Sequence, residues 1–340
     1  MNVYNFSLSD FEKYFLSIDE KRGRALTLYK WLYEIGISDF DEITDFKDEL
    51  REKLKSDFEI ATIKLVDKKE GIDVGKYLFE LSDGGRIETV LMQHDYGNSI
   101  CVSTQLGCNM GCTFCESGLH KKVRNLEISE MVQQIICTQR EAKIKADAVV
   151  VMGIGEPFDN YDNTIKFIDI ISAPKGLAIG PRHITVSTCG IVPKIVEFMN
   201  KQTPNNLAVS LHAPNNEIRN QLMPINKKYD INELVETVKK YSFMSHKKVT
   251  FEYIMLKGVN DSLECAKQLA DLLDGINCYV NLIPYNETSN LQYEKTDKQH
   301  MINFLKVIKK KGRVITIRRE FGSDLKAACG QLRSEYEKSE

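Results

Sequence analysis

Three cysteines stand close together early in the chain, and their spacing is its strongest chemical signal. Cys108, Cys112 and Cys115 form a CxxxCxxC pattern, and no fourth cysteine follows at ligand spacing. Thiolates select soft metals, and a cubane iron-sulfur cluster has several irons to ligate, so three cysteines leave one iron open to a small molecule. In radical chemistry that molecule is S-adenosylmethionine. The triad therefore predicts a 4Fe-4S cluster that binds S-adenosylmethionine.

A structural zinc site and a disulfide framework are the two alternatives to a cluster for these cysteines. A structural zinc site needs a closed fourth position, and His120 lies near enough to Cys115 to complete a Cys3His set. Structural zinc sites usually consist of two ligand pairs with short spacers, which disfavours zinc here. A disulfide framework is disfavoured further, because the nine cysteines are odd in number and irregularly spaced. With no apolar signal segment in the first residues, we expect a reducing, cytoplasmic compartment.

The composition is that of a folded globular protein. Of the 340 residues 42% are hydrophobic, which suffices for one large domain with an appendage or for two domains. No run approaches the ~18 consecutive apolar residues that span a bilayer, so we expect no membrane insertion. The net charge of -2 gives no global reason to propose a nucleic-acid partner. Local basic residues that would suit phosphate contacts are Lys121, Lys122, Arg124, Arg313, Arg318 and Arg319.

The hydrophobic periodicity divides the chain into three parts. The first is helical, with predicted helices over residues 8–18, 22–34 and 43–58. From Ala61 the period switches to two, which predicts strands over 63–66, 76–81 and 86–92, with a hairpin turn at Asp83-Gly84-Gly85. From Ser99 onward strands and helices alternate, which predicts an α/β fold with a parallel sheet, either as a barrel or as an open doubly wound sheet.

The elements of this third part follow one another regularly. The predicted strands are 100–103, 148–152, 183–187, 207–211, 249–255, 279–283 and 314–317. The predicted helices are 129–142, 163–171, 192–200, 231–241, 262–273 and 298–310.

Polar motifs follow several of these strands, at the sheet edge where chemistry is expected. The first is Gly153-Ile154-Gly155-Glu156-Pro157, in which Pro157 stands where a dinucleotide-binding GxGxxG would need a helix. Gly155 would instead let the backbone approach a ligand, and Glu156 would accept hydrogen bonds from an amine or hydroxyl. The others are Ser187-Thr188, Ser210-Leu211-His212 and Pro284-Tyr285-Asn286. By itself, His212 would more often be a core histidine than a ligand.

Together these motifs resemble the RlmN/Cfr family of radical S-adenosylmethionine RNA methyltransferases, over nearly the whole chain. The matching stretches are residues 101–108, the CxxxCxxC, and residues 153–157, 187–188, 210–212, 281–286 and 327–332. The resemblance implies a partial (βα)6 radical SAM barrel. It assigns residues 1–59 to a helical RNA-binding accessory domain, 60–97 to linking strands, 98–320 to the barrel, and 321–340 to a C-terminal loop and tail.

The resemblance also implies roles for individual residues. Cys108, Cys112 and Cys115 would ligate the cluster, Cys329 would carry the methyl group, and Cys101 would be its resolving partner. Glu88 matches the proton-accepting glutamate of the family. The S-adenosylmethionine pocket would be formed by Gly155, Glu156, Ser187, Ser210, Leu211, His212 and Asn286.

The implied reaction methylates carbon 2 of an adenosine in 23S rRNA, with tRNA as a second substrate to be tested. That carbon is electron-poor and cannot attack a methyl donor as a lone-pair nucleophile would. Cys329 would therefore take a methyl group from one S-adenosylmethionine, and a second molecule would give the 5'-deoxyadenosyl radical that activates it. A transient Cys101–Cys329 disulfide, with Glu88 as base, would release the RNA. A flavodoxin or ferredoxin would donate electrons, and the enzyme is expected to be a monomer.

Two departures from the family pattern bear on the substrate. Glu116 adds a negative charge beside the cluster where alanine is usual, and Lys121-Lys122 stands where Gly-Phe is common. Trp31 and Arg318-Arg319-Glu320 look more like RlmN than Cfr, which favours carbon 2. Cfr-type methylation of carbon 8 in 23S rRNA, with ribosomal antibiotic resistance, is the runner-up. An alternative of another class is a non-catalytic, zinc-stabilised RNA-binding protein that uses His120. The cysteines expected to be ordinary core thiols are Cys137, Cys189, Cys265 and Cys278.

Overall fold

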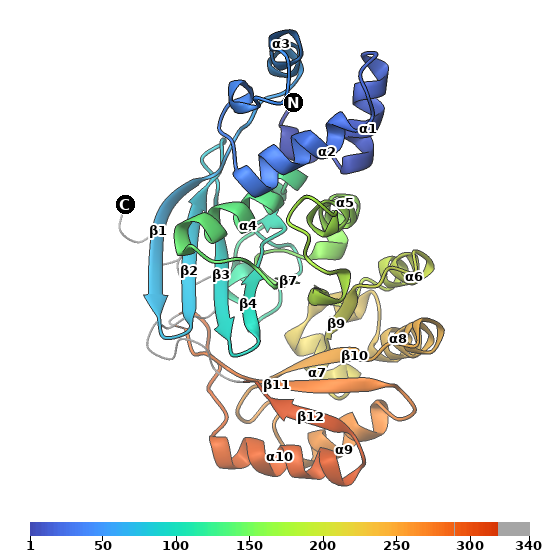
Figure 1. Ribbon diagram of the computed structural model, residues 1–340. Helices are drawn as coiled ribbons and strands as arrows, with labels where there is room; N and C mark the ends of the chain where they lie inside the picture. Colours follow the sequence, from blue (N-terminus) through green and yellow to red (C-terminus); the bar gives the residue numbers. More distant parts are fainter. Residues whose placement is uncertain (289, 319–340) are drawn as a thin grey trace.

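One curved sheet organises the computed structural model, which describes residues 1–288 and 290–318 (Figure 1). Within these residues the sheet has 10 strands in the order β1-β2-β3-β4-β7-β8-β9-β10-β11-β12. The strands are β1 Lys64–Gly71, β2 Val74–Glu80, β3 Arg86–His94, β4 Gly97–Cys101, β7 Ala148–Val151, β8 Ile184–Thr188, β9 Asn206–Ser210, β10 Val249–Met255, β11 Cys278–Pro284 and β12 Val314–Ile317. The pairs from β1 to β4 are antiparallel, and those from β4 to β12 are parallel.

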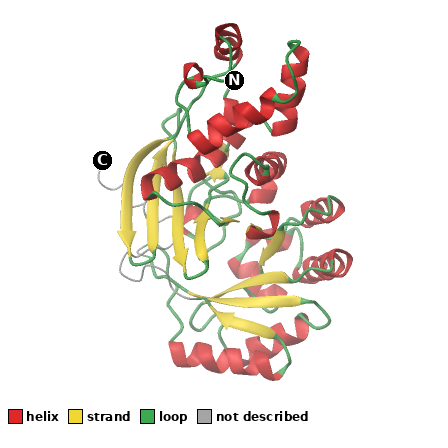
Figure 2. Ribbon diagram, in the orientation of Figure 1, coloured by secondary structure: helices red, strands yellow, loops and turns green. Residues whose placement is uncertain are grey.

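Each parallel strand from β4 to β11 is followed by a helix, and these helices flank the outer side of the sheet (Figure 2). They are α4 Ile128–Ala142, α5 Tyr161–Ser172, α6 Val192–Asn200, α8 Ile231–Ser245, α9 Leu263–Leu272 and α10 Lys298–Lys310, with the short α7 Asn216–Leu222 before α8. The predicted α/β class with a parallel sheet is confirmed. Helices on one side favour the barrel over the doubly wound arrangement, because a doubly wound sheet is covered on both faces.

Side-chain caps explain why several helices begin where the sequence predicted. Asp230, Ser262 and Asp297 each accept a hydrogen bond from a backbone N–H of the first turn of α8, α9 and α10. Such caps satisfy donors that have no partner inside the helix. Glu127 does the same for α4 in a capping box with Glu130. Local sequence therefore sets where these helices start.

Two of the predicted N-terminal helices were too long. The segment predicted over 22–34 is α2 Arg24–Tyr29 followed by a wider π turn over Lys30–Ile35, and the segment predicted over 43–58 contains only α3 Asp48–Asp57. Asp45 explains the second difference. Its side chain accepts a hydrogen bond from the indole N–H of Trp31 at 2.8 Å, and its carbonyl accepts one from Arg24 at 3.0 Å. These tertiary contacts hold the stretch before α3 outside a helix.

The N-terminal helices share an aromatic core and rest on α4. Phe58 stands at the centre of this core, with ring centroids 5.0 Å from Phe6, 5.6 Å from Phe11 and 4.8 Å from Tyr14, the last two on α1 Leu8–Ser17. Asn5 links this part to α4, because its side-chain oxygen accepts a hydrogen bond from the N–H of Ser129 at 2.7 Å. In the described part of the chain no helix is long and apolar enough to cross a membrane.

Candidate active site

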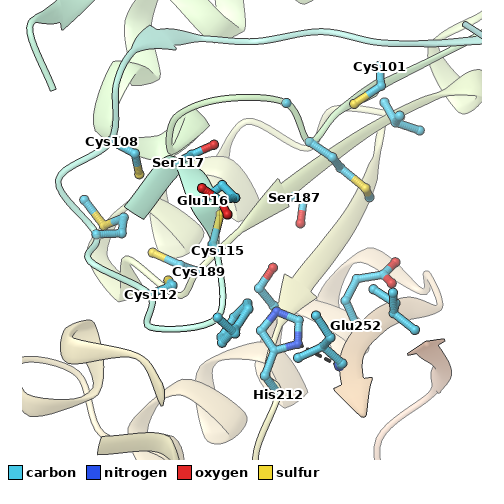
Figure 3. A pocket seen from close by; sticks show the side chains of 18 of the residues that line it. Cys101, Cys108, Cys112, Cys115, Glu116, Ser117, Ser187, Cys189, His212 and Glu252 are labelled. Atoms are coloured by element: carbon cyan, nitrogen blue, oxygen red, sulfur yellow. Dashed lines mark hydrogen bonds between the residues drawn. The ribbon is translucent and has the colours of Figure 1, made fainter. Parts of the chain in front are cut away.

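A cavity of about 350 Å³ opens on the inner side of the sheet, where the carboxyl ends of the parallel strands meet (Figure 3). All three cysteines of the CxxxCxxC line it. The other predicted site residues in its wall are Cys101, Gly155, Glu156, Ser187, Ser210, His212 and Asn286. Glu88 and Leu211 are not in the wall, and Cys329 lies outside the described residues. The fold thus gathers residues from distant parts of the sequence around one space.

The loop that carries the three cysteines is fixed by backbone contacts. The N–H of Cys108 donates to the carbonyl of His120 at 2.9 Å, and the N–H of Thr113 donates to the carbonyl of Leu222 at 3.0 Å. The hydroxyl of Thr113 also lies 2.7 Å from that of Tyr293. Leu222 is the last residue of α7, a helix that the sequence analysis missed. The cysteine loop is therefore held by α7, which lies more than a hundred residues further along the chain.

The cysteine thiols lie in a desolvated wall, and in Figure 3 their sulfur atoms gather on one side of the cavity. Burial raises the pKa of Cys108 to about 11, and it raises the pKa of Cys112 further still. A soft metal centre would shift these thiols to thiolates by binding them directly. Three thiols on one wall are the donor set that an iron-sulfur cluster requires, and the site fits that group.

The zinc alternative finds less support in this geometry. His120 is not part of the cavity wall, and its described backbone contacts go to Cys108 and Ser117. Within residues 1–288 and 290–318, no three Cys, His, Asp or Glu side chains converge on a position for a single metal ion; the three cysteines instead border a wider cavity.

Glu156 is held rigidly beside the cysteines. Its carboxylate accepts the N–H of Cys189 at 2.7 Å and the N–H of Phe158 at 3.0 Å, and its own N–H donates to Gln105 at 2.9 Å. Burial raises the pKa of this carboxyl, while the two backbone donors act in the opposite direction. Gly155 lies at φ +104°, and a Cβ there would approach the Cβ of Gln105 to 2.6 Å. The loop after β7 therefore requires glycine, and it presents Glu156 in one orientation.

His212 is fixed at the cavity wall in a strained backbone conformation, with φ +57°. Its Nδ1 accepts the N–H of Ile254 at 3.1 Å, so in the neutral ring the proton sits on Nε2. Burial, and to a lesser extent the nearby charge of Arg219, lower the pKa of His212 to about 3. The ring therefore stays neutral near pH 7 and offers one N–H donor. Leu211 lies wholly in the core behind it, and its N–H donates to the carbonyl of Glu252 at 3.1 Å.

The other end of the cavity is formed by antiparallel strands. Cys101 on β4 pairs with Val90 on β3, and both line the cavity. Glu88 stands two residues before Val90 and therefore faces the same side of the sheet, behind the wall. Its carboxylate lies 3.9 Å from the ammonium of Lys76, with both side chains at most 4% exposed. Cys101 and the ion pair of Glu88 thus share one face of the antiparallel strands β2, β3 and β4.

Two residues in the wall were missed by the sequence analysis. Cys189, expected to be an ordinary core thiol, lines the cavity and binds Glu156 through its N–H. Glu252, on β10, also lines the cavity, and its carboxylate accepts a hydrogen bond from Asn281 at 2.9 Å. Burial raises the pKa of Glu252. A signal for Glu252 existed, because it is the single charged residue within the apolar strand Val249–Met255.

Two further cysteines lie in the core, and one departure from the family pattern lies in the cavity wall. Cys265 and Cys278 are buried in the main core, as expected. Glu116 is buried in the cavity wall and accepts a hydrogen bond from Asn290 at 3.2 Å. The Ala-to-Glu departure therefore puts a carboxylate into the site itself.

The basic residues that suggested RNA contact are largely paired with carboxylates. Lys122 lies 2.6 Å from Asp159, and Arg124 lies 2.7 Å from both Asp83 and Glu130. Arg313 pairs with Asp274, while Arg318 lines the cavity. These carboxylates offset part of the positive charge of the group, Arg319 lies outside the described residues, and contact of this group with phosphates stays a prediction.

Comparisons with known proteins agree along the chain. The family model for the radical SAM superfamily matches residues 102–273, and that for the ribosomal RNA large subunit methyltransferase N-terminal domain matches residues 1–60. The probable dual-specificity RNA methyltransferases RlmN of Geobacillus kaustophilus and Bacillus subtilis are each 48% identical to this chain, covering 100% of it and 94% of each relative. The crystal structure of a radical SAM methyltransferase from Sphaerobacter thermophilus superimposes with a TM-score of 0.91 at 37% identity, covering 97% of this chain and 98% of that one.

Proposed function

Because this chain belongs to the RlmN family of radical SAM RNA methyltransferases, we propose that it methylates carbon 2 of an adenosine. Membership of the family implies a 4Fe-4S cluster and S-adenosylmethionine as cofactors. One observation carries the proposal: a single cavity joins the cysteine triad, the loop of Glu156 and Cys101. Radical generation and thiol chemistry then have a common space.

Cys108, Cys112 and Cys115 would hold the cluster, and the wall beside them would hold S-adenosylmethionine. When bound, these groups supply a 5'-deoxyadenosyl radical that abstracts a hydrogen atom. Glu156 is oriented to accept hydrogen bonds from the amino group of the methionine part. His212 offers its Nε2 proton to an acceptor of the ligand, and Ser187 and Ser210 add hydroxyl groups in the same wall. Further contacts would come from Gly155 and Asn286, which line the same cavity, while Leu211 would support the pocket from behind.

Cys329 would be the methyl carrier, and the hairpin end of the cavity would complete the reaction. A thiolate is nucleophilic enough to take a methyl group, which carbon 2 of adenine is not. After the methylene carbon has joined the base, Cys101 would attack the sulfur of Cys329 and form a disulfide, which releases the RNA. Glu88 would accept the proton lost from carbon 2. Lys76 beside it would help to orient that carboxyl.

The substrate would be 23S rRNA, and the printed name of the relatives, dual-specificity RNA methyltransferase, supports tRNA as a second substrate. Residues 1–59 would help to hold the RNA, 60–97 would link them to the barrel at 98–320, and 321–340 would deliver Cys329. Two molecules of S-adenosylmethionine would be used in each turnover. We expect a monomer that receives electrons from a flavodoxin or ferredoxin. The target adenine must be unstacked to enter the cavity.

Nucleoside mass spectrometry tests this function. Digested rRNA and tRNA from a deletion strain, complemented with the wild-type gene or with Cys329→Ala, would be compared with synthetic 2-methyl and 8-methyl adenosine. We expect 2-methyladenosine to disappear on deletion and to return only with the wild-type gene. Appearance of 8-methyladenosine instead would establish the Cfr-type reaction.

The protein itself provides a second test. Peptide mass spectrometry of the expressed enzyme should find a one-carbon adduct on Cys329, and anaerobic reconstitution should give brown protein with iron and sulfide. Colourless protein that binds zinc, with no adduct on any cysteine, would overturn the proposed function.

A further inference from the structure

Arg219, on α7, is a fully buried cation. Its side chain is 0% exposed. Nη2 donates to the carbonyl of Cys189 at 2.6 Å and lies 3.4 Å from that of Ser210. Nε donates to the carbonyl of Leu211 at 3.3 Å, and Nη1 donates to the side-chain oxygen of Asn226 at 2.9 Å. Each of the three guanidinium nitrogens thus finds at least one oxygen within the protein.

These acceptors are all neutral. Within the described part of the chain Arg219 forms no salt bridge, although taking an arginine out of water costs several kcal/mol unless a charge compensates it. Burial lowers the pKa of Arg219 to about 10, which still leaves it charged near neutral pH. Arg219 is linked to the carboxylate of Glu156 only through the backbone of Cys189. Glu156 accepts the N–H of Cys189, and Arg219 donates to the carbonyl of the same residue.

The backbone oxygens that Arg219 binds belong to the turns at the ends of β8 and β9. Cys189 directly follows β8, Ser210 ends β9, and Leu211 follows it. The same two turns carry Ser187, Ser210 and His212, which line the cavity. The helix of Arg219 ends at Leu222, whose carbonyl holds the cysteine loop through Thr113. The guanidinium of Arg219 therefore connects two turns of the cavity wall to α7, the helix that supports the cysteine loop.

We propose that Arg219 is a positioning residue of the cofactor site, which aligns the turns after β8 and β9 with the cysteine loop and supplies a fixed positive charge beside the cluster. The inference rests on the proposed function, because it assumes that Cys108, Cys112 and Cys115 bind the cluster. A cluster with three thiolates is anionic, and its reduction adds another negative charge. A buried cation stabilises the reduced form and raises the reduction potential, which net charge and hydrogen bonds control.

Two substitutions in the full-length, anaerobically reconstituted enzyme separate the two roles. Arg219→Met removes the charge and keeps most of the volume, so we expect a lower midpoint potential in an EPR-monitored redox titration. Arg219→Lys keeps a charge but cannot reach several carbonyls at once, because its ammonium lacks the planar fork of arginine. We expect this variant to retain a potential near that of the wild type but to bind S-adenosylmethionine roughly 10-fold more weakly, the effect of losing charged hydrogen bonds. Affinity is measured from the change in the cluster EPR signal as S-adenosylmethionine is added.

Asn226→Ala is the matched control. It removes one acceptor of Arg219 and the contacts of Asn226 with Asn216 and Asn220 on α7, yet it leaves the charge and the turn contacts in place. We expect a lower melting temperature with unchanged potential and affinity. The proposal is overturned if a folded Arg219→Met keeps the wild-type potential, or if Arg219→Lys binds S-adenosylmethionine as the wild type does. It is also overturned if Asn226→Ala changes the potential or the affinity as much as the Arg219 variants do. The comparison with Arg219→Lys decides the matter if Arg219→Met does not fold. Failure of the proposed function would look different, because the wild-type protein itself would then lack cluster or methylated RNA.

Discussion

The two ends of the cavity are built on different structural principles. The cysteine end consists of turns that follow parallel strands, with backbone conformations such as φ +104° at Gly155 and φ +57° at His212. The hairpin end consists of regular antiparallel strands, in which Cys101 is placed by its register with Val90. Turns need outside support to hold such conformations, whereas a strand pair is held by its own hydrogen-bond ladder. The cysteine end accordingly depends on α7, and the hairpin end depends on its own register.

The electrostatics of the two ends differ in the same way. At the cysteine end, desolvated thiols and Glu156 face an arginine that reaches them only through backbone groups. At the hairpin end, Glu88 and Lys76 form a direct ion pair within one strand pair. The buried charges of the first end thus lack a direct partner of opposite sign, whereas those of the second end are paired. Substitutions at the two ends should therefore fail in different ways.

The largest effect is expected from Cys112→Ala at the cysteine end. If Cys112 is a cluster ligand as proposed, its loss should reduce iron and sulfide to background and abolish RNA methylation, because only two thiols of the CxxxCxxC remain. Cys265→Ala is the control, since it removes a buried thiol from the main core. Iron content and activity are measured after anaerobic reconstitution. Full iron content in Cys112→Ala would contradict the assignment of the triad.

Cys101→Ala should also abolish product but leave the cysteine end intact. Without a resolving thiol, the RNA should remain tethered to Cys329, so a protein–RNA crosslink should accumulate on denaturing gels. Cluster content and S-adenosylmethionine affinity should match the wild type. Cys278→Ala, another buried thiol, serves as the control. If Cys101→Ala loses its cluster, the two ends do not work separately.

Glu88→Gln should slow turnover by about 10²–10⁴-fold, the usual contribution of a positioned general base. The variant keeps the shape of the side chain but cannot accept a proton, so the crosslinked species should persist longer than in the wild type. Single-turnover kinetics with pre-methylated enzyme measures this step. Glu80→Gln, on the same hairpin and paired with Arg86 at its edge, is the control and should retain full activity. Equal rates for both variants would remove Glu88 from the proton-accepting role.

The smallest effect concerns stability at low pH and reports on the cysteine end. The pKa of His212 is about 3 in the folded protein, against roughly 6.5 in an unfolded chain, so below pH 6.5 the unfolded state binds the extra proton. The free energy of unfolding should therefore fall as the pH drops from about 6.5 towards 3, by up to about 1.4 kcal/mol per unit from this group. Urea unfolding of the wild type and His212→Gln measures it. A slope that persists in His212→Gln but disappears in His183→Asn, at an exposed histidine, would contradict this origin.

Features that depend on short stretches of sequence were predicted well. The helices over 192–200 and 298–310 have the predicted bounds, and the hairpin turn after β2 lies at Asp83-Gly84-Gly85. Periodicity, caps and turn residues act over a few positions, so they can be recognised without the fold. The spacing of Cys108, Cys112 and Cys115 belongs to this class, because its chemistry depends only on the residue types.

What the sequence determined by itself was the alternation of strands and helices, the three thiols on one loop, and the family to which they belong. The tertiary structure decided which distant residues complete the site. Cys189, directly after β8, and Glu252, on β10, became wall residues because both strands belong to the sheet that borders the cavity. Arg219 gained its contacts because α7 packs against the turns after β8 and β9 and against the cysteine loop. The tertiary structure likewise pairs Lys122, which we expected to contact RNA phosphates, with Asp159. These contacts join residues 30 to 110 positions apart, and they follow from how the sheet curves and how helices pack on it. Local sequence patterns do not determine that geometry.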